Sequence, residues 1–277
     1  EALAEEVFKV NDHVIVALFS NYPYGESVIQ EKAEAILWSA TGAQDMGLAM
    51  AETLAGINPP AGRLNLTWYK NDAQLPDIDD YDIIKNERTY RYFTGDVVYP
   101  FGYGLTYTTF DYSQLCVNWK NAHTFTVSFT VTNKGSVTSD EVAQVYVKAP
   151  LSRVKKPLCQ LAGFKRLKQV KPGESRSVSI DVLEDEVAFY DVISSTLMVE
   201  TGQYEIFAGP SSKEPKVWAK VDISGQEPGI RSLTNTIAAD HYDDYENIVL
   251  TEGHFGYTGA QVKDFSRPAA LVYGNCT

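Results

Sequence analysis

Carboxylates that directly follow an apolar, strand-like run are the first candidates for chemistry in this sequence. Glu26 stands in the segment NYPYGES, just after the apolar run HVIVALF at residues 13–19. Sites in open α/β sheets collect at the ends of such strands, so Glu26 is a candidate general acid or base. Glu31 and Glu34 fall on the following helical turn, where we interpret them as a solvated face.

A second group of carboxylates lies in the segment LPDIDDYDII, where clustered acidic side chains could bind calcium. The group consists of Asp77, Asp79, Asp80 and Asp82. Its spacing does not fit an EF-hand loop, which needs a glycine at the central turn and a glutamate at the twelfth position. We therefore interpret it as a polar loop or the start of a helix. The histidines are scattered and suggest neither a metal site nor a charge-relay arrangement: His13, His123, His241 and His254. No cofactor is predicted.

Aromatic residues and glycines crowd the stretch ERTYRYFTGDVVYPFGYGLTYTTF. Its rings could form a platform that stacks on sugars, or the stretch could be a hinge between two domains. Tyr90, Tyr92 and Phe93 alternate imperfectly with arginines, which predicts a strand with one packed face. Phe101 and Tyr103 lie between glycines that permit a tight turn. We favour the structural interpretation, in which these rings are packed in a core.

The cysteines and the glycosylation sequons depend on the compartment that the protein enters. Cys116, Cys159 and Cys276 have no CxxC spacing, so a zinc site is not predicted. Cys116 and Cys159 could form a disulfide in an oxidising compartment, but two buried free thiols are the favoured interpretation. Asn65 (NLT) and Asn275 (NCT) are candidate glycosylation sites if the chain passes through an endoplasmic reticulum.

Composition excludes some classes of partner. The 277 residues carry a formal net charge of −12, so the surface field repels nucleic-acid backbones and anionic membranes. An apolar content of 44% is sufficient for two domain cores, and no run reaches the roughly 20 apolar residues that span a bilayer. The start EALAEEVFKV lacks a basic signal-peptide region and resembles the middle of a domain. The tryptophans are spread as core anchors would be: Trp38, Trp68, Trp119 and Trp218.

Helix and strand patterns alternate through the first hundred residues. An amphipathic helix is predicted at residues 1–10 and a small-residue helix at residues 48–54. The predicted strands are at residues 13–19, 35–38 and 64–68, and the first of them reads as a buried parallel strand. This order predicts an open parallel sheet with covering helices.

Beyond residue 108 the pattern changes to strict alternation. Phe125, Val127, Phe129 and Val131 share one face of a predicted strand. Further strands are predicted at residues 142–147, 161–167, 174–182 and 202–208. Short strands separated by turn signals indicate an antiparallel sandwich of the immunoglobulin or fibronectin type III kind. The predicted organisation is an α/β part at 1–107, a sandwich at 108–224, and a linker and tail at 225–277 that could begin a further module.

Several motifs together resemble the C-terminal part of glycoside hydrolase family 3. The resemblance covers residues 1 to about 223 and rests on the order and spacing of its elements. Those of the α/β part are Ala35-Ile36-Leu37-Trp38, Gly42, Gln44, Gly56, Asn58-Pro59, Gly62-Arg63-Leu64, Thr67-Trp68, Gln74-Leu75-Pro76, Arg88-Thr89-Tyr90-Arg91-Tyr92 and Pro100-Phe101-Gly102-Tyr103-Gly104-Leu105. Those of the sandwich are Glu141-Val142-Ala143-Gln144-Val145-Tyr146 and Leu161-Ala162-Gly163-Phe164-Lys165-Arg166.

The resemblance implies a part of a retaining, exo-acting β-glycosidase. Such enzymes need two carboxyl groups roughly 5 Å apart, a nucleophile and an acid/base. In this family the nucleophile lies on a (β/α)8 barrel, and the acid/base lies upstream of the strand predicted at residues 13–19. Neither is therefore expected in this chain, and similar sequences carry an apolar residue at the position of Glu26. We accordingly interpret Glu26 as a loop-surface carboxylate and predict no catalytic residue.

The expected function is the C-terminal region of an enzyme that releases xylose or glucose from plant-type oligosaccharides. Its segment from Leu75-Pro76 to Tyr92 is nearest to family members that act on xylo-oligosaccharides. The expected partners are an oligosaccharide substrate and the N-terminal barrel portion, from the same gene or from a second chain. A secreted or periplasmic location is expected, and a cytoplasmic one stays open. The alternative is a non-catalytic carbohydrate-binding or adhesion module.

Overall fold

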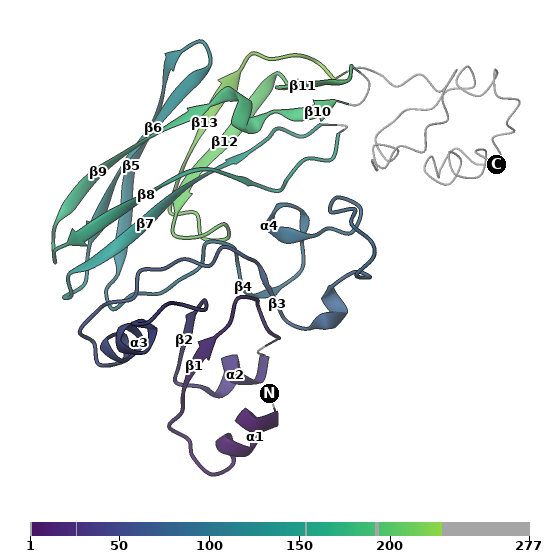
Figure 1. The fold of residues 1–277 in the computed structure, drawn as a ribbon. Helices are drawn as coiled ribbons and strands as arrows, with labels where there is room; N and C mark the ends of the chain where they lie inside the picture. Colours follow the sequence, from purple (N-terminus) through teal and green to yellow (C-terminus); the bar gives the residue numbers. More distant parts are fainter. Residues whose placement is uncertain (1, 26, 153, 192–193, 229–277) are drawn as a thin grey trace, which may run out of the picture.

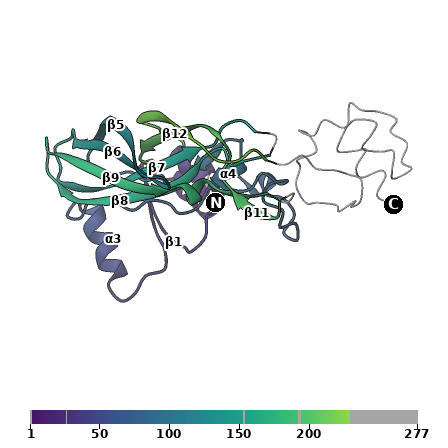
Figure 2. The ribbon, with the colours of Figure 1, turned by 90° about the horizontal axis from the view of Figure 1, so that it is seen from above.

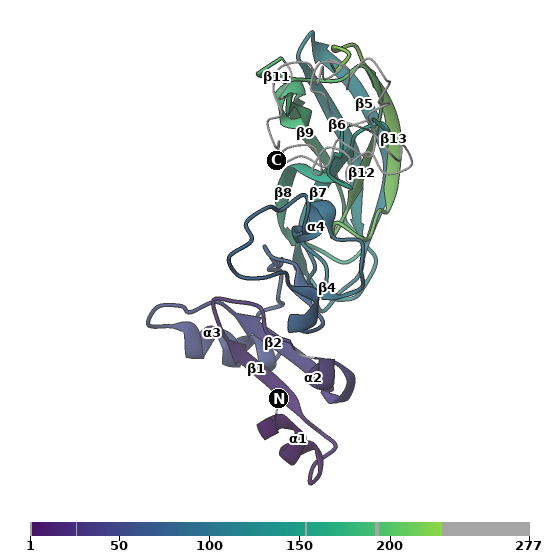
Figure 3. The ribbon, with the colours of Figure 1, turned by 90° about the vertical axis from the view of Figure 1, so that its right-hand side faces the viewer.

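The computed structural model describes residues 2–25, 27–152, 154–191 and 194–228. The chain forms an α/β part and a β-sandwich that are stacked end to end (Figures 1 and 3). In the view from above, the sandwich strands lie over the α/β part, and helix α3 stands out to one side (Figure 2). Within these residues no helix is long and apolar enough to cross a membrane.

The α/β part confirms the predicted alternation of helices and parallel strands. Its elements in chain order are α1 (Ala2–Phe8), β1 (Ile15–Phe19), α2 (Ser27–Lys32), β2 (Ala35–Ser39) and α3 (Met46–Leu54). Strands β1 and β2 pair in parallel, with Ile15 opposite Ala35 and Phe19 opposite Ser39. Helix α3 ends before Gly56, whose φ of +75° is a conformation that glycine adopts without strain.

The prediction of a buried first strand is wrong for the described part of the chain. Side chains along β1 alternate between exposed and half-buried, and Ile15 and Phe19 are 56% and 48% exposed. The apolar face of α1 is also open, since Leu3 is 81% exposed. The physical reason is that β1 pairs only with β2 among the described residues, so little surface covers its two faces.

The segment between α3 and the sandwich differs most from the sequence prediction. Strand β3 (Trp68–Tyr69) has two residues instead of the predicted 64–68, and it pairs antiparallel with β4 (Val97–Tyr99). A short 3-10 helix, η1 (Asp72–Gln74), and helix α4 (Thr89–Tyr92) lie between them. The strand predicted around Tyr90 is therefore wrong: the Phe93 N–H donates to the Thr89 carbonyl at 2.9 Å, which closes a helical turn.

The second part is an antiparallel sandwich, as predicted. One sheet has the order β5-β6-β9 and the other β13-β12-β7-β8. The strands are β5 (Phe110–Asn121), β6 (Thr124–Asn133), β7 (Ser139–Lys148), β8 (Gln160–Val170), β9 (Ser175–Leu183), β12 (Gly202–Gly209) and β13 (Val217–Ile223). The short 3-10 helix η2 (Glu184–Val187) leads into a small hairpin, β10 (Phe189–Asp191) and β11 (Thr196–Met198).

Alternation along the strands builds the sandwich core. Phe125, Val127 and Val131 of β6 are fully buried and face the other sheet, as their spacing predicted. The prediction of four core tryptophans is only partly correct. Trp68 is 2% exposed, whereas Trp218 is 68% exposed because it occupies an outward position of β13. Trp119 is 43% exposed, although its ring contacts the buried Phe125 opposite it on β6.

A buried ion pair fastens the two parts together. Arg63, from the loop that precedes β3, donates from Nη2 to Glu141 Oε2 on β7 at 2.7 Å. The two side chains are 7% and 2% exposed. The Tyr112 hydroxyl donates to the other carboxylate oxygen at 2.8 Å, and burial followed by the Glu141 charge raises the pKa of Tyr112. Glu141 thus enters the sandwich with both oxygens bonded.

A glycine contact forms a second fastening. Gly102 has a φ of +84°, and a Cβ there would lie 2.2 Å from Gln144 Oε1 and 2.6 Å from the Tyr146 hydroxyl. Gln144 donates from Nε2 to the Gly102 carbonyl at 3.1 Å, and Tyr146 donates to Gln144 Oε1 at 2.6 Å. The stretch around Gly102, which we call the lead into the sandwich because it precedes β5, therefore lies directly on the outer face of β7. This contact confirms that the glycine-rich stretch turns tightly between the two parts.

Candidate functional site

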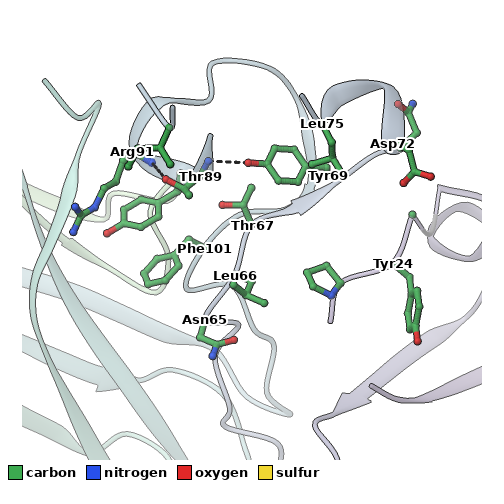
Figure 4. A pocket seen from close by; sticks show the side chains of 15 residues that line it. Tyr24, Asn65, Leu66, Thr67, Tyr69, Asp72, Leu75, Thr89, Arg91 and Phe101 are labelled. Atoms are coloured by element: carbon green, nitrogen blue, oxygen red, sulfur yellow. Dashed lines mark hydrogen bonds between the residues drawn. The ribbon is translucent and has the colours of Figure 1, made fainter. Parts of the chain in front are cut away.

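A pocket of about 520 Å³ opens between the α/β part and the lead into the sandwich. Four segments line it: the loop after β1, the residues around β3, the loop through η1, and the stretch from α4 to Phe101. In the close-up, Thr67 lies at the centre, with Thr89 and Phe101 on one side and Tyr24 on the other (Figure 4). The volume lies within the range of small-molecule sites.

Local strain marks one wall of this pocket. Thr89 has a φ of +65°, which is unusual for a β-branched residue, and Glu87, two residues earlier, has a φ of +49°. The Thr89 N–H donates to the Tyr69 hydroxyl at 2.8 Å, which holds the strained turn in place (Figure 4). Strained residues of this kind persist where the surrounding structure fixes them, and they concentrate at functional sites.

Aromatic rings form the wall nearest to the sandwich. Tyr90 is stacked on Phe101, with centroids 4.1 Å apart and planes 14° apart. The Tyr90 hydroxyl accepts from the Leu161 N–H at 3.1 Å, so the ring is anchored to β8. Phe101 is half-buried and lines the pocket. The same rings therefore join the two parts of the chain and line the pocket.

Hydroxyl groups give the pocket its polar character. Thr67 is 9% exposed, and its Oγ1 atom has no hydrogen-bond partner among the described residues. The Tyr69 hydroxyl oxygen accepts a hydrogen bond from the Thr89 N–H, and its own O–H can donate to a further acceptor. Asn65 is exposed and stands in the wall. Among the described lining residues Asp72 is the only carboxylate, so these groups are suited to binding and supply no carboxylate pair.

The carboxylates singled out from the sequence take different places. Glu26 lies outside the described residues. The aspartate group forms a polar loop, in agreement with prediction, and its side chains accept from nearby backbone N–H groups. Arg88 braces this loop by donating to the carbonyls of Asp77 and Asp80. Hydrogen bonds from the Asn86 side chain and the Asp82 N–H lower the pKa of Asp80.

Of the cysteines and glycosylation sequons singled out from the sequence that the structure describes, only Asn65 lines the pocket. Cys116 and Cys159 are both free thiols, but Cys116 is exposed, so the prediction that both are buried is wrong. Cys116 lies near the middle of β5, on the face of the sheet that is turned away from the sandwich core and toward solvent. Burial raises the pKa of Cys159 to about 12. Asn275 and Cys276 lie outside the described residues.

Sequence reasoning did not find the pocket because its walls come from segments that are far apart in the chain. The sequence pattern around Tyr90 predicts a strand, whereas a short helix, α4, presents its ring. One signal was present: aromatic residues are frequent in the stretch that begins at Glu87, with threonines among them. That signal alone does not identify the opposite wall at Tyr24.

Two family models match the chain. The glycosyl hydrolase family 3 C-terminal domain matches residues 1–107, and the fibronectin type III-like domain matches residues 141–212.

Similar proteins agree with these models. A xylan 1,4-β-xylosidase of Xylanibacter ruminicola is 38% identical over 183 residues, which is 66% of this chain and 21% of the relative. The thermostable β-glucosidase B of Acetivibrio thermocellus is 30% identical and matches 76% of this chain and 30% of that one. The crystal structure of the β-D-glucoside glucohydrolase of Trichoderma reesei superposes with a TM-score of 0.72 at 25% identity, over 80% of this chain and 35% of that chain. The chain thus spans about a fifth to a third of the length of these relatives.

Proposed function

Because the chain carries the C-terminal domain of glycosyl hydrolase family 3 followed by a fibronectin type III-like domain, we propose that it is the C-terminal part of a retaining, exo-acting β-glycosidase. The observation that carries the proposal is that these two domains follow one another in one chain, at residues 1–107 and 141–212. The relatives that support it include both β-xylosidases and β-glucosidases.

In this proposal, the two catalytic carboxylates of the enzyme lie outside the described residues. Retention requires two carboxyl groups roughly 5 Å apart. Asp72 is the only carboxylate among the described residues of the pocket wall. We therefore assign the nucleophile to an N-terminal barrel portion, which is the proposed partner of this chain, and the acid/base to a segment upstream of the strand predicted at residues 13–19. The chain itself supplies one wall of the substrate cleft and a sandwich that braces it.

The proposed substrates are plant-type oligosaccharides with terminal xylose or glucose. Xylose is the first choice, because the relative of highest identity among those compared above is named a xylan 1,4-β-xylosidase. A secreted or periplasmic enzyme fits such substrates and is the proposed location.

A chimera tests the proposal directly. The C-terminal region of the Xylanibacter ruminicola enzyme that matches this chain is replaced by residues 1–277, and nitrophenyl β-xyloside and β-glucoside are the substrates. We expect the chimera to hydrolyse at least one of them and to release first the β-anomer of the sugar, as seen by proton NMR. The same enzyme without its C-terminal region is the control, and it is expected to be inactive.

Two results would count against the proposal. A folded chimera without activity would remove the support for an enzymatic role and favour the alternative of a non-catalytic carbohydrate-binding module. Turnover of either nitrophenyl glycoside by the isolated chain would contradict the placement of the nucleophile outside it.

A further inference from the structure

We infer that a second pocket, which we call the basic pocket, binds a small organic carboxylate with an apolar body. It has a volume of about 200 Å³, and its described lining shares only Arg91 with the pocket at Phe101. Its walls include the end of α4, the end of β7, the loop at residues 154–160 and the segment at residues 187–190. The inference goes beyond the proposed function, because it concerns a ligand other than the glycoside substrate.

The charges of the lining favour an anion. Three basic side chains line the basic pocket, and no carboxylate does so among the described residues: Arg91, Lys155 and Lys156. The whole chain carries a formal net charge of −12, so this cluster opposes the general field of the protein. The acidic side chains of the neighbouring η2 are not part of the described lining: Glu184, Asp185 and Glu186.

The two lysines have carboxylate partners outside the lining. Lys156 forms a buried ion pair with Glu200, and its ammonium group lies 4.5 Å from the centre of the Phe189 ring. Lys155 lies 3.5 Å from Glu87, but this pair is partly exposed and contributes little. The Arg91 guanidinium forms no hydrogen bond or ion pair with the described residues. Three cations and two carboxylates therefore leave one positive charge for a ligand.

The Arg91 side chain is placed to receive that ligand. The Leu158 N–H donates to the Arg91 carbonyl at 2.6 Å, which fixes α4 on the loop that carries the two lysines. In the close-up, the guanidinium points away from Thr67 at the centre of the other pocket (Figure 4). A guanidinium presents two parallel N–H groups that match the two oxygens of a carboxylate. Because the backbone of Arg91 is held beforehand, little ordering entropy is lost on binding.

The rest of the lining favours an organic anion over a bare inorganic one. Tyr92 and Val147 are buried, and Phe189 completes an apolar wall. Phosphate would lose its hydration against such a wall without gaining an apolar contact, whereas a hydrocarbon body gains one. The volume of about 200 Å³ admits only a small body, such as one aromatic ring or a short aliphatic chain.

The test titrates the full 277-residue chain with sodium benzoate and with sodium butyrate, which distinguish an aromatic from an aliphatic body. Calorimetry and NMR shift changes give the Kd at constant ionic strength, since salt screens the charges. Benzamide, which is neutral, and inorganic phosphate are the ligand controls. Arg91→Gln removes the charge, and Arg91→Lys keeps the charge without the paired N–H groups. Arg166→Gln is the matched control, because Arg166 is exposed on β8 outside the lining and its loss changes the net charge equally.

We expect benzoate or butyrate to bind, and Arg91→Gln to raise the Kd about 10-fold or more. Arg91→Lys should give an intermediate Kd, and Arg166→Gln should leave the Kd unchanged. Circular dichroism checks that each variant is folded. Lys155→Gln, at a partly exposed position, tests the same cluster independently and should raise the Kd roughly 2- to 5-fold.

Three results would overturn the inference. The first is that neither carboxylate binds. The second is that benzamide or phosphate binds as tightly as the better carboxylate. The third is an equal Kd for Arg91→Gln and Arg166→Gln, which would place the bound carboxylate away from the basic pocket.

Discussion

The fastening at Gly102 gives a prediction whose size follows from the structure. Replacing Gly102 with alanine has two separate costs. The first is the φ of +84°, which costs a residue with a Cβ about 1–2 kcal/mol. The second is the contact, because the new methyl group would lie 2.2 Å from Gln144 Oε1.

The contact cost comes from the hydrogen bonds that Gln144 must give up. Its amide donates to the Gly102 and Pro210 carbonyls and accepts from the Tyr146 hydroxyl, and the bonds to Gly102 and Tyr146 are buried. Each buried polar group left without a partner costs about 1–3 kcal/mol. With two such groups added to the φ cost, we expect Gly102→Ala to lose roughly 4 kcal/mol or more of unfolding free energy.

Gly173 provides the matched control for this variant. It has a similar φ of +76°, and a Cβ there would meet nothing within 4 Å. Gly173→Ala should therefore lose only about 1–2 kcal/mol. Urea unfolding followed by tryptophan fluorescence and by circular dichroism measures both variants. Equal losses for the two glycines would show that Gly102 is needed only for its φ, and the close packing of the lead on β7 would have no energetic role.

Three further outcomes are expected. Arg63→Met should lose about 3–5 kcal/mol of unfolding free energy in urea, because it leaves the Glu141 charge buried without its partner, and the double variant Arg63→Met/Glu141→Gln should lose less. A double variant whose loss equals the sum of the losses of the two single variants would contradict this. In a Cys276→Ser background at pH 8, iodoacetamide should label Cys116 quickly and Cys159 only in urea, because the Cys159 pKa of about 12 leaves almost no thiolate. Peptide mass spectrometry gives the two labelling rates, and equal rates would refute the burial of the Cys159 thiol. Tyr103→Ala should cost roughly 3 kcal/mol in thermal unfolding, since the ring is stacked on Tyr99 at 4.9 Å; an unchanged midpoint would show that this stacking is not needed.

The sandwich could be predicted from the sequence in some detail. A strand with one buried face needs a period of two, and Phe125, Val127, Phe129 and Val131 follow it without a break. The parallel pairing of β1 and β2 was predicted in the same way, from two apolar runs with a helical segment between them. Both predictions depend on local patterns, which a single sequence displays directly.

The burial of β1 and the shape of the pocket depend on contacts between distant segments. An apolar run shows that a strand can be buried, but its neighbours decide whether it is, and Ile15 remains 56% exposed. Trp218 is 68% exposed for a related reason. The residue type alone does not show whether its side chain points to the core or to the solvent side of β13. The pocket needs Tyr24 and Phe101 to approach each other across 77 positions, which no periodicity reveals.

The ion pair between Arg63 and Glu141 bears on where this protein can be divided. Sequence patterns change near residue 108, which looks like a natural place to cut out the sandwich for use elsewhere. A protein that begins there would keep Glu141 in the interior with the Tyr112 hydroxyl and lose the guanidinium that neutralises it. The sandwich is therefore a recognisable unit of sequence but an incomplete unit of charge, and a transferable version of it would have to begin before Arg63 or replace Glu141.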